Sequence, residues 1–301
     1  MKVVIIGGVA GGATAAARIR RLDEKAEIVV FERSGFVSYA NCGLPYYIGG
    51  TIEDESDLTL QTPESFWKRF RVRMKVHHEV MEIHPEEKTV TVKNLESGTV
   101  FIEQYDKLLL SPGAKPIKPE FDGIESSRIF TLRTVEDTLK IKKYLTTYHP
   151  KSAVVVGGGF IGIEVAENLK ESGVDVTLVE ASDQLMAPFD RDMASFIHTQ
   201  VRKNGIHLML DHMVEGFADT DQGIDVRLKD SDTISADIVV MAIGVAPETG
   251  LAKAAGLAIG IRGSIVVNNR METSVPDIYA VGDAVQIKNF VTNTDTLISL
   301  A

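Results

Sequence analysis

The sequence has few cysteines, no clustered histidines and no excess of basic residues, and each of these absences excludes a class of protein. Its single cysteine, Cys42, excludes an intramolecular disulfide framework and a multi-cysteine metal site, and is typical of a reducing compartment. The seven histidines are scattered without metal-ligand spacing, so we expect no metal ion. Acidic residues outnumber basic ones, which gives a formal net charge of −10, and there is no long Lys/Arg block. We therefore expect no nucleic-acid partner.

The apolar run at the N-terminus is too short for a signal-peptide core or a membrane span. It extends from Lys2 to Ile6 and is interrupted by Gly7 and Gly8, which predicts a buried strand and no membrane partner. With 44% hydrophobic and 25% charged residues, the composition is typical of soluble globular proteins. A length of 301 residues suggests two domains, and we expect a cytoplasmic protein.

A first βαβ unit opens the chain. The strand Lys2 to Ile6 leads into a helix of small residues from about Gly11 to Leu22 and a strand from Glu27 to Phe31. In a dinucleotide-binding turn the first glycine makes the turn, the middle one admits the pyrophosphate and the last allows close helix packing. Val9 occupies the middle position here, but Glu32 follows the second strand, where a carboxylate can bind a ribose. The alternative is a glycine-rich turn without a ligand. The glycines of this turn are Gly7, Gly8, Gly11 and Gly12.

A second copy of the pattern begins at Ser152, so the chain carries an internal duplication. The run from Gly157 to Gly162 matches GxGxxG in full, between a strand and a helix from about Phe160 to Ser172. Glu180 ends the next strand, which starts near Val176, and would accept a ribose 2′-hydroxyl but repel a 2′-phosphate. NADH is therefore favoured, with NADPH left open.

Further elements are expected around the two units. Thr62, Pro63 and Glu64 indicate a helix start, and a hairpin around Pro85 is predicted from its alternating strands. The strands expected are Glu79 to Ile83, Thr89 to Val92, Lys107 to Leu110 and Ile238 to Ile243, with an extended segment from Ser264 to Val267.

Three further motifs complete the pattern: LLLSPGA (108–114), MAIGVAPE (241–248) and YAVGDA (279–284). In this order the motifs resemble the pyridine nucleotide-disulfide oxidoreductases over essentially the whole chain. The resemblance implies an α/β fold of two Rossmann-like, three-layer domains. An FAD domain would comprise residues 1–113 and 246–301, with an NAD(P)H domain, 114–245, inserted into it.

The resemblance also implies which residues bind the two cofactors. Asp283 would hydrogen-bond the ribityl chain of FAD, and Phe160 would be an aromatic gate that NADH displaces, although a packing role for this ring is a close alternative. The implied FAD residues are Gly7, Gly8, Gly11, Gly12, Glu32, Arg33, Gly113, Gly282 and Asp283. Those for the nicotinamide nucleotide are Gly157, Gly159, Phe160, Gly162, Glu180 and Gly244.

Cys42 is the candidate reactive group. It follows an extended loop and is expected at a helix N-terminus, which stabilises a thiolate, whereas a lone cysteine elsewhere is often an inert buried side chain. A single thiol can cycle only through a mixed disulfide, a persulfide or a sulfenic acid. The run Asn41 to Tyr46 resembles the single-cysteine branch of the family that reduces coenzyme A disulfide or polysulfides. Ala10 stands where oxidases and peroxidases of that branch hold a histidine, which counts against peroxide chemistry.

One face of the first helix is a candidate substrate surface. Thr14, Arg18 and Arg21 are spaced i, i+4, i+7 and offer a hydroxyl and two guanidiniums to an anion, although a solvated basic face is an equal alternative. The resemblance implies that these three contact coenzyme A together with Ser38 and Asn41. Arg71 is a weaker candidate for a phosphate contact.

The expected function is reduction of a disulfide or sulfane sulfur by NADH, through FAD and Cys42. Coenzyme A disulfide is the first expected substrate, followed by polysulfide or coenzyme A persulfide. Two alternatives stay open: an NADH oxidase or peroxidase that cycles a sulfenic acid at Cys42, and a flavin-bearing redox sensor or docking module. The family continues with an interface domain that builds a homodimer and, in some members, a rhodanese domain. We therefore expect this chain to be part of a longer homodimeric protein and to be slow as a reductase by itself.

Overall fold

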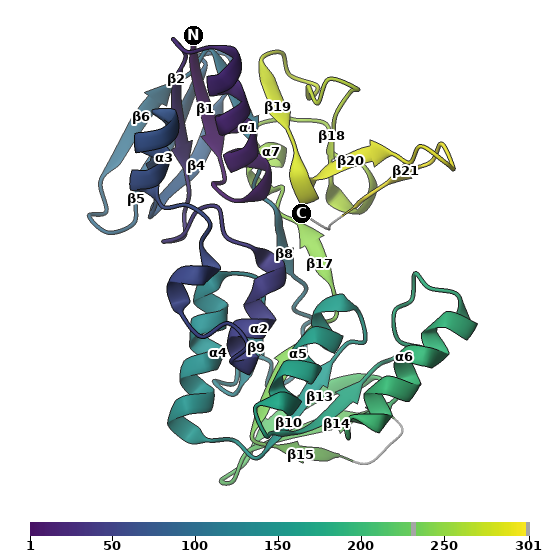
Figure 1. Ribbon diagram of the computed structural model, residues 1–301. Coiled ribbons are helices and arrows are strands. Elements are labelled where there is room, and N and C mark those ends of the chain that lie inside the picture. The colour runs from purple at the N-terminus through teal and green to yellow at the C-terminus, as the bar shows by residue number, and fades with distance from the viewer. Residues whose placement is uncertain (230–232, 299–301) are drawn as a thin grey trace. The chain divides into compact units, whose positions relative to one another are not determined.

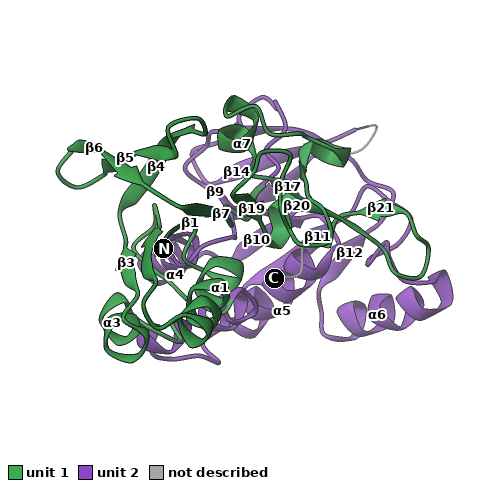
Figure 2. Cartoon of the chain, turned by 90° about the horizontal axis from the view of Figure 1, so that it is seen from above, with its two compact units in different colours: residues 1–40, 59–115, 245–301 green, residues 41–58, 116–244 purple. Residues whose placement is uncertain are grey.

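The computed structural model describes residues 1–229 and 233–298, which form two compact units, shown together in Figure 1 and by colour in Figure 2. Among these residues, no helix has both the length and the apolar character that crossing a membrane requires. Each unit has a parallel sheet and its own packed layers, so the α/β class predicted from the sequence is confirmed. Unit 1 comprises residues 1–40, 59–115 and 245–301, and unit 2 comprises residues 41–58 and 116–244.

Unit 1 is centred on a parallel sheet in the order β19-β7-β1-β2-β3. Strand β1 (Lys2–Ile6) lies between β2 and β7, so that Ile6 pairs with Phe31 on one side and Leu110 on the other. Side chains alternate along β1: Val3 and Ile5 face α1 and α3, and Val4 and Ile6 face the opposite layer. Because the carboxyl ends of these strands are level, the residues that follow them meet at one edge of the sheet.

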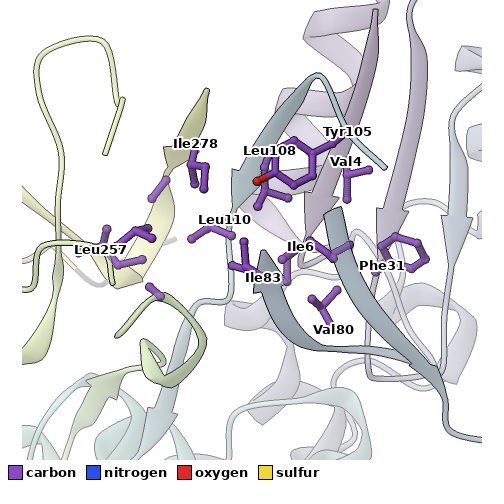
Figure 3. Close-up of a cluster of buried hydrophobic side chains, with 14 of the residues drawn as sticks. Val4, Ile6, Phe31, Val80, Ile83, Tyr105, Leu108, Leu110, Leu257 and Ile278 are labelled. Atoms are coloured by element: carbon purple, nitrogen blue, oxygen red, sulfur yellow. The ribbon is translucent and has the colours of Figure 1, made fainter. Parts of the chain in front are cut away.

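The opposite layer of unit 1 is the antiparallel sheet β4-β5-β6. Val80 and Ile83 of this sheet pack against Val4, Phe31 and other residues of the parallel sheet, as Figure 3 shows. The predicted hairpin is therefore confirmed, and its sheet is the third layer of a helix–sheet–sheet arrangement.

The helices of unit 1 are α1 (Ala10–Leu22), α3 (Pro63–Phe70) and α7 (Gly250–Ala254). Its other strands are β2 (Glu27–Phe31), β3 (Arg73–Lys75), β4 (His78–His84), β5 (Thr89–Asn94), β6 (Val100–Gln104), β7 (Lys107–Leu110), β8 (Ala114–Pro116, which ends at the unit boundary), β17 (Val245–Pro247), β18 (Ile265–Val266), β19 (Ile278–Ala280), β20 (Val285–Lys288) and β21 (Asp295–Thr296).

Unit 2 repeats the same plan. Its parallel sheet has the order β12-β11-β10-β16-β9, with β10 (Ser152–Val156) at the centre, where Val156 pairs with Val179 and Met241. The antiparallel sheet β13-β14-β15 covers one face through Phe217 and other apolar side chains. Its helices are α2 (Leu44–Gly49), α4 (Val135–Tyr148), α5 (Phe160–Glu171) and α6 (Arg191–Lys203), and its other strands are β9 (Ile129–Thr131), β11 (Asp175–Val179), β12 (His207–Met209), β13 (Val214–Asp219), β14 (Ile224–Leu228), β15 (Ile234–Ala236) and β16 (Ile238–Met241).

The segment 41–58 differs from the sequence-based layout, because it groups with unit 2 although it falls inside the range predicted for the first domain. The reason is the packing of α2 on α4 and α5. The Nζ of Lys142 in α4 donates to the carbonyl of Ile48 at 3.0 Å. A Cβ on Gly49 would overlap Asn168 of α5, so the two helices approach at a residue without a side chain. Two element ends also differ slightly from the prediction. Helix α1 begins at Ala10 rather than Gly11, and strand β16 ends at Met241 rather than Ile243.

Candidate functional site

The glycine turn of unit 2 links β10 to α5. Gly157 has a φ of +109°, and a Cβ there would overlap the carbonyl of Ala242, which follows the neighbouring strand β16. A Cβ on Gly162 would overlap the carbonyl of Gly157, so α5 packs against the turn only with glycine at this position. A Cβ on Gly159 would meet nothing within 4 Å. The middle glycine therefore borders open space where a pyrophosphate can approach the backbone.

Glu180 is held at this turn by backbone amides. Its Oε2 accepts a hydrogen bond from the Gly158 N–H at 2.6 Å, and its Oε1 accepts one from the Ser182 N–H at 2.8 Å. The parallel register explains the contact, because Glu180 directly follows the strand that pairs with the one before Gly157. The carboxylate is thus fixed at the position where a dinucleotide presents its ribose.

Unit 1 repeats this construction. Gly7 has a φ of +98°, and a Cβ there would overlap the carbonyl of Ser111. The first glycine of the unit 2 turn is constrained in the same way. The buried Glu32 accepts hydrogen bonds from the Gly8 N–H at 2.8 Å and the Ser34 N–H at 2.9 Å. A Cβ on Gly12 would overlap the carbonyl of Gly7. The duplication inferred from the sequence therefore extends to individual hydrogen bonds.

The two turns differ in their middle positions. Unit 1 has Val9 where unit 2 has a glycine, and a Cβ on the neighbouring Gly11 would lie 2.6 Å from the Ser111 Oγ and 2.9 Å from the Val281 Cγ2. Gly11 therefore allows α1 to approach closely the residues that directly follow β7 and β19. Both turns retain a glycine at the tight first position and an acidic residue after the second strand, and both fit a dinucleotide.

Asp283 lies at the same edge of the unit 1 sheet. It sits in a 3-10 turn over Gly282–Ala284, which begins two residues after the end of β19, and is only 3% exposed. Since β19 pairs in parallel with β7, Asp283 follows a strand end on the same side of the sheet as Gly7. A buried carboxylate at that edge suits the hydroxyl groups of a bound cofactor.

The remaining glycines predicted to bind cofactors make turns, and one arginine is at the surface. Gly113 has a φ of +71° and its carbonyl accepts from the Glu248 N–H at 3.0 Å. Arg33 is exposed and its guanidinium lies 3.8 Å from the Glu248 carboxylate. In unit 2, Gly244 has a φ of +117° and its carbonyl accepts from the Ile117 N–H at 3.0 Å.

Phe160 is the first residue of α5 and is not a core residue. Half of its surface is exposed, and its ring meets the ring of Phe189 edge-on with 6.5 Å between centroids. Phe189 is itself 42% exposed and was not identified from the sequence, since the segment before α6 has no pattern that distinguishes it. A half-exposed aromatic pair beside the turn leaves the gate interpretation open and removes burial in the core as an explanation.

Cys42 is exposed and lies in a 3-10 turn, Asn41–Gly43, directly before α2. The expected helix N-terminus is therefore present, with Cys42 two residues ahead of the first residue of α2. Tyr46, one turn further on, has a raised pKa, caused first by the Glu164 carboxylate of α5, then by burial and by Glu167 and Cys42. Burial, followed by Glu167, raises the pKa of Glu164 as well. Tyr46 of α2, Glu164 and Glu167 of α5 and the Cys42 thiol just before α2 thus form one electrostatically coupled cluster.

This cluster was not predicted from the sequence, although one signal for it exists. Glu164 is a charged residue in the apolar run FIGIEVAENL, at a position that the helix turns toward its neighbours. Nothing local in the sequence identifies Tyr46 as its partner, because the pairing depends on the long-range packing of α2 on α5.

The predicted substrate face of α1 is exposed. Thr14, Arg18 and Arg21 all lie on the solvent side of the helix, and the Arg21 guanidinium is 5.8 Å from the centroid of the Phe70 ring. Arg71 ends α3 in the left-handed conformation, with its guanidinium 5.4 Å from the Trp67 ring. Ser38, at a φ of +50°, donates its backbone N–H to the carbonyl of Gly8 at 2.9 Å. These five candidates belong to unit 1, and Asn41 belongs to unit 2.

Comparison with known proteins agrees with this geometry. The family model described as pyridine nucleotide-disulphide oxidoreductase matches residues 1–296. Coenzyme A disulfide reductase of Staphylococcus aureus (strain JH9) is 38% identical over 282 residues, which are 94% of this chain and 63% of that protein. The chain thus spans less than two thirds of the length of the curated relatives that it matches.

Solved structures give the same result. Reduced CoADR-RHD of Bacillus anthracis superposes with a TM-score of 0.97 at 49% identity, covering 99% of this chain and 54% of that one. A NAD-dependent persulfide reductase from A. fulgidus has a TM-score of 0.95 at 35% identity, over 100% and 56% of the two chains. A water-forming NADH oxidase from Lactobacillus brevis, bound to NADH, has a TM-score of 0.93 at 32% identity, over 100% and 66%.

These matches confirm the predicted fold of two Rossmann-like domains and the predicted use of FAD with a nicotinamide nucleotide. The family model covers nearly the whole chain, and each of the relatives above exceeds 30% identity over at least 94% of it. The chain belongs to the pyridine nucleotide-disulphide oxidoreductase family.

Proposed function

We propose that this chain forms the nucleotide-binding units of an NADH-dependent coenzyme A disulfide reductase that works through Cys42. The observation that carries the proposal is the combination of two dinucleotide turns with one cysteine, which is exposed on the turn before α2. Two nucleotide sites provide for electron transfer between two cofactors, and a single accessible thiol limits the sulfur chemistry to one-cysteine cycles.

We place FAD on the turn of unit 1 and the nicotinamide nucleotide on the turn of unit 2. The buried Asp283 and the fixed Glu32 support the first placement, and the open space at Gly159 supports the second. Glu180 favours NADH, because its carboxylate accepts a ribose hydroxyl and repels a 2′-phosphate. When bound, FAD supplies a relay for two electrons from the nicotinamide to sulfur. The FAD domain is proposed to comprise residues 1–113 and 246–301, of which segment 41–58 packs with unit 2, and the NAD(P)H domain residues 114–245.

The sulfur chemistry of Cys42 follows from its single thiol. The Cys42 thiolate attacks one sulfur of the substrate disulfide, a Cys42–coenzyme A disulfide forms and the other coenzyme A thiolate leaves. Two electrons from NADH then cleave that mixed disulfide, which regenerates the Cys42 thiolate and releases the second coenzyme A as a thiolate. One NADH and one proton are consumed for each disulfide, and two coenzyme A thiols result.

A coenzyme A substrate is supported by the curated relatives and by the charge on α1. Arg18 and Arg21 are exposed one turn apart, beside the hydroxyl of Thr14, and guanidinium groups bind phosphate oxygens in a bidentate manner. Arg71, Ser38 and Asn41 are the further residues that we assign to this ligand. The persulfide reductase from A. fulgidus supports polysulfide or coenzyme A persulfide as a second substrate.

The working protein is proposed to be a cytoplasmic homodimer that is longer than this chain. This proposal rests on the resemblance to the family and on the share of the relatives that the chain spans, which is 54% for CoADR-RHD. It implies that the 301 residues bind both cofactors but turn over slowly in isolation.

The test is NADH-dependent release of thiol from coenzyme A disulfide by the full-length protein and its Cys42→Ser variant. The proposal expects two thiols per NADH from the wild type and none from the variant, with FAD retained by both. Thiol release that survives in Cys42→Ser would contradict the proposal, as would a wild type that consumes NADH without releasing thiol.

A second candidate is an NADH oxidase that forms a sulfenic acid on Cys42, and the structural match to the water-forming NADH oxidase favours it. Ala10 stands against it, because a histidine is expected there in oxidases and peroxidases. Comparing NADH consumption with coenzyme A disulfide, peroxide and oxygen as acceptors separates the two functions. A sensor or docking function would instead show NADH-dependent partner binding with little turnover on any acceptor.

A further inference from the structure

The loop between β11 and α6, residues 180–190, covers the glycine turn of unit 2. The fully buried side chain of Leu185 fills the space beside Gly158, where an added Cβ would overlap it. The Met186 N–H donates to the carbonyl of Gly158 at 2.8 Å. The same loop supplies Glu180, whose carboxylate accepts the Gly158 N–H. The loop is therefore attached to the turn by two hydrogen bonds and one packed side chain.

A histidine of α6 holds the loop. The Leu185 N–H donates to the Nε2 of His198 at 3.0 Å. Because a backbone amide can only donate, the Nε2 must carry no proton, and the ring must be the neutral form with its proton on Nδ1. Protonation would place an N–H against the Leu185 N–H and break the bond.

Burial and the nearby charges together favour the neutral ring of His198. Burial lowers the pKa of His198, and the guanidiniums of Arg202 and Arg191 in α6 lower it further, while Asp183 in the loop opposes them. Arg191 and Asp183 also form an ion pair at 2.6 Å. This pair is exposed and screened, so the bond between His198 and Leu185 is the stronger connection from α6 to the loop.

We propose that His198 is a positioning residue for the nicotinamide nucleotide: its neutral ring holds Leu185 and the loop against Gly158, and its protonation loosens the turn and weakens nucleotide binding. The inference rests on the proposed placement of the nucleotide on this turn. It goes beyond that placement by assigning the site a dependence on pH through His198, whose Nε2 accepts from the Leu185 N–H.

The contacts inside the loop explain why the effect would extend along it. The Gln184 Nε2 donates to the Phe189 carbonyl at 2.9 Å, and the Phe189 N–H donates to the Met186 carbonyl at 2.8 Å. These bonds make residues 184–189 a connected segment, and Phe189 meets the ring of Phe160. Release at Leu185 therefore moves the segment as a whole rather than one residue.

The experiment is calorimetric titration of the FAD-loaded protein with NAD⁺, which is stable in acid, at pH 7.5 and pH 5.5. Protonation of His198 removes one hydrogen bond, so the wild-type Kd should rise as the pH falls to 5.5, by up to about three- to tenfold. His198→Gln keeps an acceptor oxygen that does not titrate, so its Kd should change much less. His198→Ala should bind weakly at both values. His207→Gln, at an exposed histidine of unit 2, is the control and should behave as the wild type does.

A second readout does not depend on binding. Amide hydrogen exchange over residues 182–190, corrected for its intrinsic pH dependence, should accelerate at pH 5.5 in the wild type but not in His198→Gln. Equal pH dependence of the Kd in these two proteins would overturn the inference alone. If Gly159→Ala binds NAD⁺ as tightly as the wild type, the placement of the nucleotide and the inference are both wrong.

Discussion

A Cβ on Gly162 would overlap the carbonyl oxygen of Gly157, whereas a Cβ on Gly159 would meet nothing within 4 Å. These two glycines of one turn therefore have different roles. Gly162 allows α5 to pack against the turn, and Gly159 borders the space proposed for the nicotinamide nucleotide. The same contrast cannot be drawn in unit 1, where Val9 holds the middle position.

Alanine substitution at these two positions should therefore have separate effects. Gly162→Ala is expected to lower the free energy of unfolding of unit 2 by about 1–3 kcal/mol, as overpacking does. Gly159→Ala should leave stability within about 0.5 kcal/mol of the wild type but weaken NAD⁺ binding by about tenfold or more. Urea unfolding and calorimetry measure the two quantities. A strongly destabilised Gly159→Ala protein would show that this position is structural.

Phe160 offers a test of the gate against a packing role. Because half of the ring is exposed and its one aromatic neighbour is Phe189 among the described residues, Phe160→Ala should cost only about 1 kcal/mol of stability. Phe217→Ala, at a ring only 2% exposed in the same unit, is the matched control and should cost about 3–5 kcal/mol. A gate predicts that Phe160→Ala also changes the KM for NADH in steady-state assays. An unchanged KM would favour packing.

The raised pKa of Glu164 predicts how stability changes with pH. Burial first, and then the charge of Glu167, favour the protonated carboxyl in the folded protein. Its contribution to stability is therefore complete below the ordinary pKa of a glutamate and is lost as the pH rises through the raised value. Glu164→Gln, which cannot ionise, should raise the melting temperature at pH 7 and have little effect at pH 4.

The control for this experiment is Glu120→Gln, at an exposed glutamate of unit 2. It should leave the melting temperature nearly unchanged at both pH values. If Glu164→Gln lowers the melting temperature at pH 7, the carboxylate is a favourable partner in the α2–α5 cluster, and the desolvation argument fails.

The exposed face of α1 predicts the origin of substrate affinity. Arg18→Ala and Arg21→Ala should each raise the KM for coenzyme A disulfide about three- to tenfold, because each removes a charge-assisted hydrogen bond to phosphate at an exposed site. Arg18→Lys should recover part of the loss, since an ammonium cannot bind in a bidentate manner. Arg270→Ala, at an exposed arginine of unit 1, is the control and should leave the KM unchanged. An unchanged KM in the α1 variants would mean that the face is only solvated.

The two nucleotide turns could be predicted from the sequence because their determinants are local. A short strand, a glycine turn and an acidic residue after the next strand are all encoded within about 30 residues. The parallel register then necessarily brings Glu32 to Gly8 and Glu180 to Gly158. The helix α4 could have been found in the same way, since Thr134 and Asp137 form a capping box.

The rest depends on packing between distant segments. The run from Asn41 to Gly50 contains no pattern that predicts its packing with unit 2, because this packing depends on Asn168 of α5, which faces Gly49. The contact of His198 with Leu185 likewise depends on how α6 folds back over the loop. Such contacts have no periodicity or motif, so the sequence of one protein cannot reveal them.

The most direct test of the account is anaerobic titration of the FAD-loaded protein with NADH, followed by visible absorption, for the wild type and Cys42→Ser. With Cys42 starting as its disulfide with coenzyme A, the account predicts that the first two electrons cleave this disulfide and produce a long-wavelength charge-transfer band from the Cys42 thiolate to the oxidised flavin. In Cys42→Ser the first two electrons should reduce the flavin, and no such band should form. A band that is equally strong in Cys42→Ser, or a wild type whose flavin NADH cannot reduce, would contradict the central claim that Cys42 exchanges electrons with FAD.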